Sequence, residues 1–248
     1  MNILDTSRGG EMMWQAWLSL DRKQLLRDPI FFMAILLPLL LMLFIAKGLP
    51  WFESVAPFSI TPHIPYLLSI FLLLTPITVG MMVGLMMLEE RDESLVTYFA
   101  ITPLGKGRYV AFRIGIPLLI NFVLSIVLVI VFHDAALMRW EVFLHLITSS
   151  LETPLMALAI LAFAANRLEG LAVAKMLNFI LLPPIILYFL ADKWRIFGLI
   201  VPTYWVSEGI LALSADSVVK FWGFWLGGTA YHILLIWLLF SRFNRLFH

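Results

Sequence analysis

The feature that most constrains this chain is a stretch from Ile64 to Leu88 that carries no charged side chain. A helix needs about 20 predominantly apolar residues to cross the hydrocarbon core of a bilayer, so this stretch is long enough to span one. Charged residues make up 13% of the whole chain, whereas soluble domains contain about 25%. Because 62% of the residues are hydrophobic, the chain cannot hide its apolar surface inside itself, and the bilayer must act as its solvent.

Five further stretches have a similar apolar character. We therefore expect an all-α integral membrane protein, a single transmembrane domain over residues 1–248 with six transmembrane helices. Gly80 and Gly84 have the spacing that lets two helices approach closely, and we expect them to serve packing within one subunit rather than a dimer interface. The predicted spans cover about 30–46, 64–88, 114–132, 142–165, 171–191 and 221–241.

Two other segments have the composition of structure at the membrane surface. Residues 11–28 place Trp14 and Trp17 on one side of a helix, which is typical of an interfacial amphipathic helix; the alternative is a polar tail that only precedes the first span. Residues 192–220 contain an apolar stretch, Ile196 to Ser207, that is too short to cross. We expect this outer segment to form a re-entrant or surface-lying hairpin before the last helix.

Basic residues are distributed unevenly between the two sides of the predicted bundle. If the N-terminus is cytoplasmic, 12 of the 17 Lys and Arg residues fall on the cytoplasmic side, an excess that is characteristic of cytoplasmic loops. We therefore expect a multi-pass protein of a bacterial or archaeal cell membrane with both termini in the cytoplasm. The residues placed inside are Arg8, Arg22, Lys23, Arg27, Arg91, Lys106, Arg108, Arg113, Arg167, Lys175, Arg242 and Arg245, and those placed outside are Lys47, Arg139, Lys193, Arg195 and Lys220.

The longest polar interruption of the apolar pattern runs from Glu89 to Arg113. At 100° per residue, Leu95 and Phe99 share one face of a helix, while acidic side chains take the opposite face. Pro103 disfavours helix at the residue before it and so marks the end of the pattern. We expect a short amphipathic helix over residues 89–105 at the cytoplasmic membrane surface; the alternative is a solvated loop between two spans.

Sequence motifs of soluble enzymes are absent. No phosphate-binding loop, zinc-protease motif or hydrolase nucleophile motif occurs. The chain has no Cys and its five His residues are scattered, so we expect no metal site and no cofactor bound by this chain, and we expect each His to serve packing or the interface. With a net charge of +1 and no dense basic tract, nucleic acid is not an expected partner.

Glu152 is the strongest candidate functional residue inside a predicted span. A carboxylate in the membrane is expensive, so it should face the interior of the bundle or water. It could line a translocation path or couple to protons; alternatively, it is neutral and hydrogen-bonded beside a kink at Pro154. Asn121 and Asn178 are polar residues in two other spans and complete the candidate path.

The order of these features resembles the membrane subunit of ABC-2-type transporters over nearly the whole chain. The resemblance rests on RDPIFFMAILLPLLLMLF in the first span, on LEERDESLVTYFAITPLGKGRYVAFR after the second, and on VPTYWVSEG before the last. The subfamily of fluoroquinolone export permeases has a similar layout. Ser94 stands where the family commonly has glycine. The positions that fit the family pattern are Glu90, Arg91, Glu93, Ser94, Leu95, Thr102, Pro103 and Leu104.

The resemblance implies that residues 89–105 form a coupling helix that docks on a separate cytoplasmic ATPase. ATP and Mg would bind to that partner, so this chain would not itself be an enzyme. Two membrane subunits, identical or related, would assemble in the bilayer with two ATPases and export a drug-like or lipophilic substrate. Leu95 and Phe99 would form the docking knob, and the acidic residues would meet a basic rim on the ATPase. The implied coupling residues are Glu89, Glu90, Arg91, Glu93, Leu95, Phe99, Thr102 and Pro103.

Two functions from other classes remain as alternatives. A membrane-embedded enzyme could use Glu152 as an acid or base, but no second catalytic group stands at motif spacing. A non-transporting assembly or sensory subunit is the other alternative. A neighbouring gene for an ATPase with a phosphate-binding loop would favour export over both.

Overall fold

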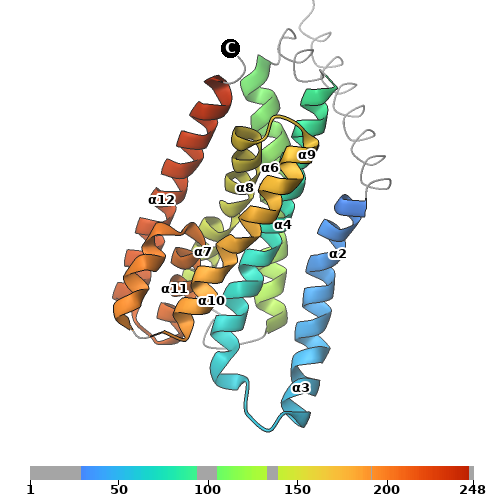
Figure 1. Ribbon diagram of the computed structural model, residues 1–248. Helices are drawn as coiled ribbons and strands as arrows, with labels where there is room; N and C mark the ends of the chain where they lie inside the picture. The colour runs from blue at the N-terminus through green and yellow to red at the C-terminus, as the bar shows by residue number, and fades with distance from the viewer. Residues whose placement is uncertain (1–28, 94–104, 133–138, 191, 246–248) are drawn as a thin grey trace, which may run out of the picture.

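The structure is a computed structural model that describes residues 29–93, 105–132, 139–190 and 192–245. All regular secondary structure in these residues is helical, as predicted (Figure 1). The interfacial helix predicted at residues 11–28 lies outside the described residues. The elements are α2 (Pro29–Leu43), η1 (Phe44–Gly48), α3 (Leu49–Val55), η2 (Thr61–His63), α4 (Ile64–Asp92), α6 (Gly105–Phe132), α7 (Trp140–Ser150), α8 (Glu152–Phe163), α9 (Arg167–Leu177), η4 (Asn178–Leu181), α10 (Leu182–Tyr188), η5 (Asp192–Ile200), α11 (Pro202–Ser214) and α12 (Val218–Arg245).

In the described part of the chain, six helical segments are long and apolar enough to cross a membrane, which confirms the predicted number of spans. The first segment differs most from its predicted bounds, because the helical path continues through η1 and α3 to Val55 instead of ending at Ala46. Pro50 does not stop this path, since it stands in the first turn of α3, where its missing N–H breaks no intrahelical hydrogen bond. The six segments are Leu36–Val55, Thr61–Asp92, Tyr109–Phe132, Trp140–Phe163, Arg167–Tyr188 and Val218–Arg245.

The fourth span consists of two helices, α7 and α8, which meet at Leu151. Pro154 explains the junction, because it lacks the N–H that would bond to the carbonyl of Ser150 in a continuous helix. Glu152 therefore begins α8 and lies in the middle of the span. This span is the most deeply buried of the six, and every residue from Glu152 to Ala162 is buried.

Helix α8 lies at the centre of the bundle and packs against both α4 and α12. The spans α4, α7–α8 and α12 run in one direction, while α2, α6 and α9–α10 run in the opposite direction (Figure 1). Gly80 and Gly84 of α4 face α8 so closely that a Cβ at Gly80 would lie 2.4 Å from the Thr153 carbonyl oxygen. The two glycines thus serve packing within one subunit, as the sequence predicts.

The segment before the last span contains η5 and α11. The apolar stretch from Ile196 to Ser207 is divided between them, because α11 begins at Pro202. Helix α11 packs against α4, α7 and α12, and most of its residues are buried. Trp205 and Tyr231 both donate to carbonyl oxygens of η5, at Leu199 (2.9 Å) and Ile200 (2.6 Å), and so fix η5 to the bundle. The re-entrant arrangement relative to a membrane stays a prediction.

Candidate functional site

Glu90 lies in the last turn of α4 and is almost completely buried. Its carboxylate accepts hydrogen bonds from the hydroxyl of Tyr109 and from Nε of Arg113, the latter at 3.1 Å. Nη2 of Arg113 forms an ion pair with the other carboxylate oxygen, so the contact is bidentate. Both partners lie on α6. The cluster therefore joins the two helices that precede and follow residues 94–104.

The turn between α8 and α9 is bonded to the same end of α4. Arg167 donates from Nη1 to Glu89 at 2.6 Å and from its backbone N–H to Asp92 at 3.3 Å. Arg91 donates from Nη2 to the carbonyl oxygen of Ala164 at 2.8 Å. Four consecutive residues of α4 thus contact either α6 or the α8–α9 turn. We call this set the coupling-end network, and it consists of Glu89, Glu90, Arg91, Asp92, Tyr109, Arg113, Ala164 and Arg167.

The network changes the interpretation of the predicted coupling helix. Glu89, Glu90 and Arg91 continue α4 and do not begin a separate helix, and Glu93 stands exposed in the turn that follows. Glu90 was expected on the polar face of this helix, where it would meet a basic rim on the ATPase; in the structure it is buried, and Arg113 compensates its charge in the interior. The other predicted coupling residues lie outside the described residues; they are Leu95, Phe99, Thr102 and Pro103.

A second polar feature joins the fourth and sixth spans along their whole length. Within the described residues, four hydrogen bonds connect α7–α8 to α12, and each pairs residues 80 or 81 positions apart. The register is constant because the two spans run parallel. Polar side chains of this kind hold helices together in a membrane. This ladder consists of Trp225 Nε1 to the Leu144 carbonyl (3.1 Å), Thr148 Oγ1 to Thr229 Oγ1 (2.6 Å), His232 Nε2 to Glu152 Oε1 (3.1 Å) and Arg242 Nε to the Ala162 carbonyl (2.9 Å).

The third pair of the ladder, Glu152 and His232, contains two titratable groups that are both fully buried. Nδ1 of His232 contacts the carbonyl oxygen of Gly228 at 2.7 Å. The second carboxylate oxygen of Glu152, Oε2, has no hydrogen-bond partner among the described residues. The expectation that Glu152 faces the interior of the bundle is correct, and both of its sequence-based roles remain chemically open at this position.

Neither of the other predicted path residues is hydrogen-bonded to Glu152 in the described part of the chain. Asn121 is buried in α6, and neither polar atom of its side chain has a partner in the described part of the chain. Ser125, one turn further along α6, is buried and unpartnered in the same way, so the two residues form a polar stripe on the inner face of α6. Asn178 is exposed, and its amide donates to the Ala174 carbonyl of its own helical run at 3.2 Å.

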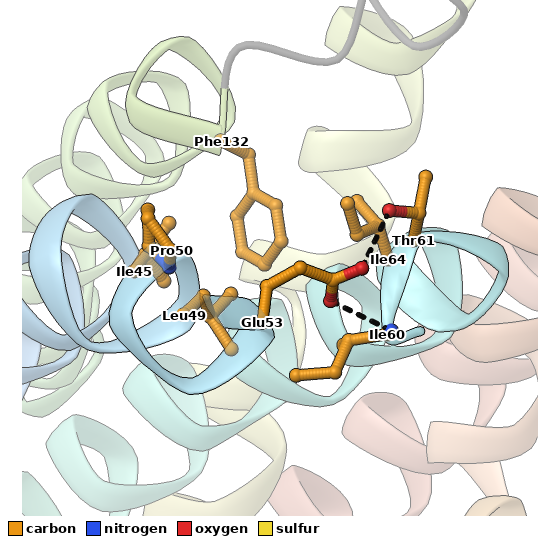
Figure 2. A pocket seen from close by; sticks show the side chains of 8 residues that line it. All are labelled: Ile45, Leu49, Pro50, Glu53, Ile60, Thr61, Ile64 and Phe132. Carbon is orange, nitrogen blue, oxygen red and sulfur yellow. Dashed lines mark hydrogen bonds between the residues drawn. The ribbon is translucent and has the colours of Figure 1, made fainter. Parts of the chain in front are cut away.

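A pocket of about 190 Å³ lies at the opposite end of the bundle from the coupling-end network, between α3, η2 and the end of α6 (Figure 2). Glu53 accepts hydrogen bonds there from the side chains of Ser59 (2.7 Å) and Thr61 (3.2 Å) and from the backbone N–H of Ile60 (2.7 Å). Its carboxylate therefore secures the connection between α3 and α4. Pockets for drug-sized ligands are larger, about 300–1,000 Å³, so this pocket does not fit a whole ligand of that kind.

The sequence analysis did not identify three residues of these clusters as members of them. In the sequence, His232 is one of five scattered histidines, whereas in the structure it is the partner of Glu152. Thr229 and His232 stand three residues apart on one face of α12, which is the signal that could have marked α12 as the partner helix. In the sequence analysis, Arg167 is only one of the basic residues that set the orientation. In the structure, it binds Glu89 and so connects the α8–α9 turn to the end of α4.

Comparison with known proteins gives a family match over most of the chain. The family model "Fluoroquinolones export permease protein Rv2686c-like" matches residues 21–240. The chain is similar to the fluoroquinolones export permease proteins Rv2686c and MT2760 from Mycobacterium tuberculosis, strains ATCC 25618 / H37Rv and CDC 1551 / Oshkosh, respectively. It is 25% identical to each over 228 residues, and the similarity covers 88% of this chain and 88% of each relative. No solved structure matches the chain.

Proposed function

The chain belongs to the Rv2686c-like family of fluoroquinolone export permeases, which are ABC-2-type membrane subunits, and on this premise we propose that it forms the membrane pathway of an ATP-driven exporter. The family match over residues 21–240 is the observation that carries the proposal. The alternatives, an enzyme built on Glu152 and a non-transporting subunit, have no comparable support.

The coupling-end network supports a specific route for the energy of ATP hydrolysis. Residues 94–104 connect α4 to α6, and the cluster around Glu90 bonds these two helices immediately beside that connection. A cytoplasmic ATPase that displaces the connection would move α4 and α6 together. Arg167 and Arg91 would transmit the movement to the α8–α9 turn. Rigid-body tilting of packed helices is a common way to open one side of such a bundle.

The permease requires partners that bind the nucleotide and complete the pathway. ATP and Mg would bind to the ATPase, because this chain has no phosphate-binding loop. A second permease subunit, identical or related, would face this one across the membrane pathway. The excess of basic residues on one side supports cytoplasmic termini and a cytoplasmic position for the coupling-end network.

The substrate proposed from the family is a fluoroquinolone or a similar amphiphilic drug. Glu152 and Asn121 are buried polar groups within spans and are the residues that we assign to the pathway. Intramembrane polar groups typically mark substrate or ion pathways. In the present packing both residues are closed off from solvent, so a substrate could reach them only after the helices separate.

The test is ATP-driven transport by the assembled exporter. The chain is co-expressed with a candidate partner ATPase that carries a phosphate-binding loop, and uptake of a fluorescent fluoroquinolone into inside-out membrane vesicles is followed after ATP addition. The proposal predicts uptake that requires both proteins and that disappears when the phosphate-binding lysine of the ATPase is replaced. Uptake without the ATPase would contradict the proposed energy source. No uptake of any fluoroquinolone by an intact, ATP-hydrolysing complex would contradict the proposed substrate.

A further inference from the structure

The hydrogen bonds of His232 determine where its protons lie. The carbonyl oxygen of Gly228 can only accept a hydrogen bond, so the Nδ1 atom that contacts it at 2.7 Å must carry a proton. The Nε2 atom contacts Oε1 of Glu152 at 3.1 Å, and a hydrogen bond there requires a second proton between the two atoms. This second proton belongs either to an imidazolium beside a carboxylate or to a carboxylic acid beside a neutral imidazole.

Both arrangements contain the same number of protons and have no net charge. Loss of the shared proton would place a bare carboxylate against an imidazole lone pair in a fully buried site. Gain of a further proton would leave an imidazolium beside a neutral acid. Each change creates an uncompensated charge in the membrane interior, which is costly. The closed bundle therefore holds one shared proton in this pair.

The neighbouring elements offer no other charge that could replace this proton. Helix α4 has no titratable side chain between Tyr66 and Glu89, and α6 has none after Arg113. On α7, Glu141 pairs with Arg139 at 3.2 Å. His145 is fully buried, and its Nε2 contacts the Val206 carbonyl oxygen at 2.8 Å, so this nitrogen carries a proton, while its Nδ1 has no hydrogen-bond partner among the described residues.

On the remaining packed elements, the titratable groups are engaged elsewhere or exposed. Glu208 of α11 pairs with Arg195 at 3.7 Å, and the hydroxyl of Tyr231 on α12 donates to η5. Tyr204 of α11 packs its ring beside Gly198 of η5 and against Phe224. On α9, Lys175 is exposed. Among the described residues, no hydrogen bond or ion pair joins Glu152 or His232 to another titratable side chain, so the shared proton lies between these two groups.

Polar atoms without partners lie at the same level of the bundle. Thr153, next to Glu152, and Thr75 of α4 both have buried hydroxyl groups without a partner among the described residues. Thr75 lies between Leu72, whose carbonyl accepts from Ser149, and the glycine that faces Thr153. Buried polar groups in proteins are almost always hydrogen-bonded, so water has favourable contacts here once the helices separate.

We propose that Glu152 and His232 form a proton-binding site in the membrane interior, which holds one shared proton while α8 and α12 are paired and exchanges it with water during the export cycle. The binding of the shared proton rests on the hydrogen-bond geometry, and the exchange rests also on the proposed function. The hydrogen bond between Glu152 and His232 forms only while the shared proton is present. Proton exchange is therefore linked to separation of the two spans.

The first experiment locates the protons and requires no transport. The full chain is labelled with ¹⁵N-histidine in lipid nanodiscs, and the signals of His232 are assigned by their loss in His232→Gln. We expect Nδ1 of His232 to stay protonated from about pH 6 to pH 9, and we expect the Nε2 signal over this range to report the proton that Nε2 shares with Glu152, either bound to Nε2 or donated to it. An Nε2 signal of an unprotonated nitrogen that accepts no hydrogen bond, or an unprotonated Nδ1, would overturn the proposal.

The second experiment measures the exchange in the assembled exporter. The pH dependence of ATP-driven fluoroquinolone uptake is compared for the parent and the double variant Glu152→Gln, His232→Gln. In the parent, the plot of uptake against pH should contain a region in which uptake changes by up to about tenfold per pH unit, as expected for one essential proton. The plot for the double variant should lack this region. Thr148→Val, Thr229→Val is the matched control, because it removes the neighbouring rung of the ladder without removing a titratable group.

The control pair should lower uptake without changing the shape of the pH profile. Proton exchange at this site would be contradicted if the parent and the double Gln variant had the same pH profile. It would also be contradicted if the profile of the double Val variant were flat. If the Gln pair does not fold, Glu152→Gln alone serves, since its amide can donate to the Nε2 of a neutral His232. If the complex transports no fluoroquinolone, the proposed function fails, while the histidine spectrum still decides whether the shared proton exists.

Discussion

Replacing Glu90 by Gln tests whether the buried ion pair at the end of α4 holds α6 in place. The substitution removes the charge that compensates Arg113, which is only 8% exposed, but keeps a carbonyl oxygen that can accept from Tyr109. Removal of one partner from a buried ion pair costs about 3–5 kcal/mol. At about 1.4 kcal/mol per factor of ten, the equilibrium between folded and unfolded chain should shift by roughly 10²- to 10⁴-fold.

Thermal denaturation of the purified chain in lipid nanodiscs measures this loss. Glu89→Gln is the matched control, because the neighbouring pair of Glu89 and Arg167 is about one-third exposed, and exposed pairs contribute about 0–1 kcal/mol. Adding Arg113→Gln to Glu90→Gln should restore most of the stability, since the double substitution removes both charges of the buried pair. In the assembled exporter, Glu90→Gln should also lower the amount of drug transported per ATP hydrolysed, because α4 and α6 no longer move together.

Two results would refute this reasoning. Equal destabilisation by Glu89→Gln and Glu90→Gln would show that burial does not distinguish the two pairs. A parent-like melting temperature and parent-like coupling in Glu90→Gln would show that the cluster neither stabilises the bundle nor transmits movement.

Further substitutions test packing, docking and orientation. Gly80→Ala should destabilise the chain by about 1–3 kcal/mol in the same thermal melt, because the new Cβ would lie 2.4 Å from a backbone carbonyl oxygen of α8; Gly115→Ala, which has open space around it, should be neutral or stabilising, and equal effects would contradict the packing. The double variant Leu95→Ala, Phe99→Ala should insert normally but lose ATPase co-purification or transport-coupled ATP hydrolysis, since up to roughly 3–6 kcal/mol of apolar burial is removed; parent-like binding and transport would exclude the docking knob. A cysteine at Gly105 should not react with an impermeant thiol reagent in intact cells, and labelling there would reverse the proposed orientation.

The number of spans could be predicted from the sequence because each span is an apolar stretch of the required length. The residues at which the spans begin and end were harder to predict than their number. Pro50 suggests a loop from composition, yet it stands in the first turn of a helix, where proline is tolerated. The burial of Glu152 also followed from sequence, because the cost of an intramembrane carboxylate is a general property of the bilayer.

The partners of the charged residues could not be predicted, because they depend on how distant helices pack. His232 lies 80 residues from Glu152 in the chain, and only the parallel register of α8 and α12 brings them together. Glu90 was expected on the polar face of a surface helix, because helical periodicity puts it opposite Leu95 and Phe99. Its burial depends on Arg113 of α6, which compensates its charge and which local periodicity does not place.

The most direct test of the proposed ATPase docking site uses a single cysteine, since the chain has none of its own. Glu93 is exposed in the turn that ends α4, whereas Ser54 is exposed on α3 at the opposite end of the bundle (Figure 1). A photo-crosslinker attached to Glu93→Cys should capture the ATPase on irradiation of the transporting complex, and the same reagent on Ser54→Cys should not. Capture from Ser54→Cys, or no capture from Glu93→Cys in a complex that still transports, would contradict docking at the coupling-end network.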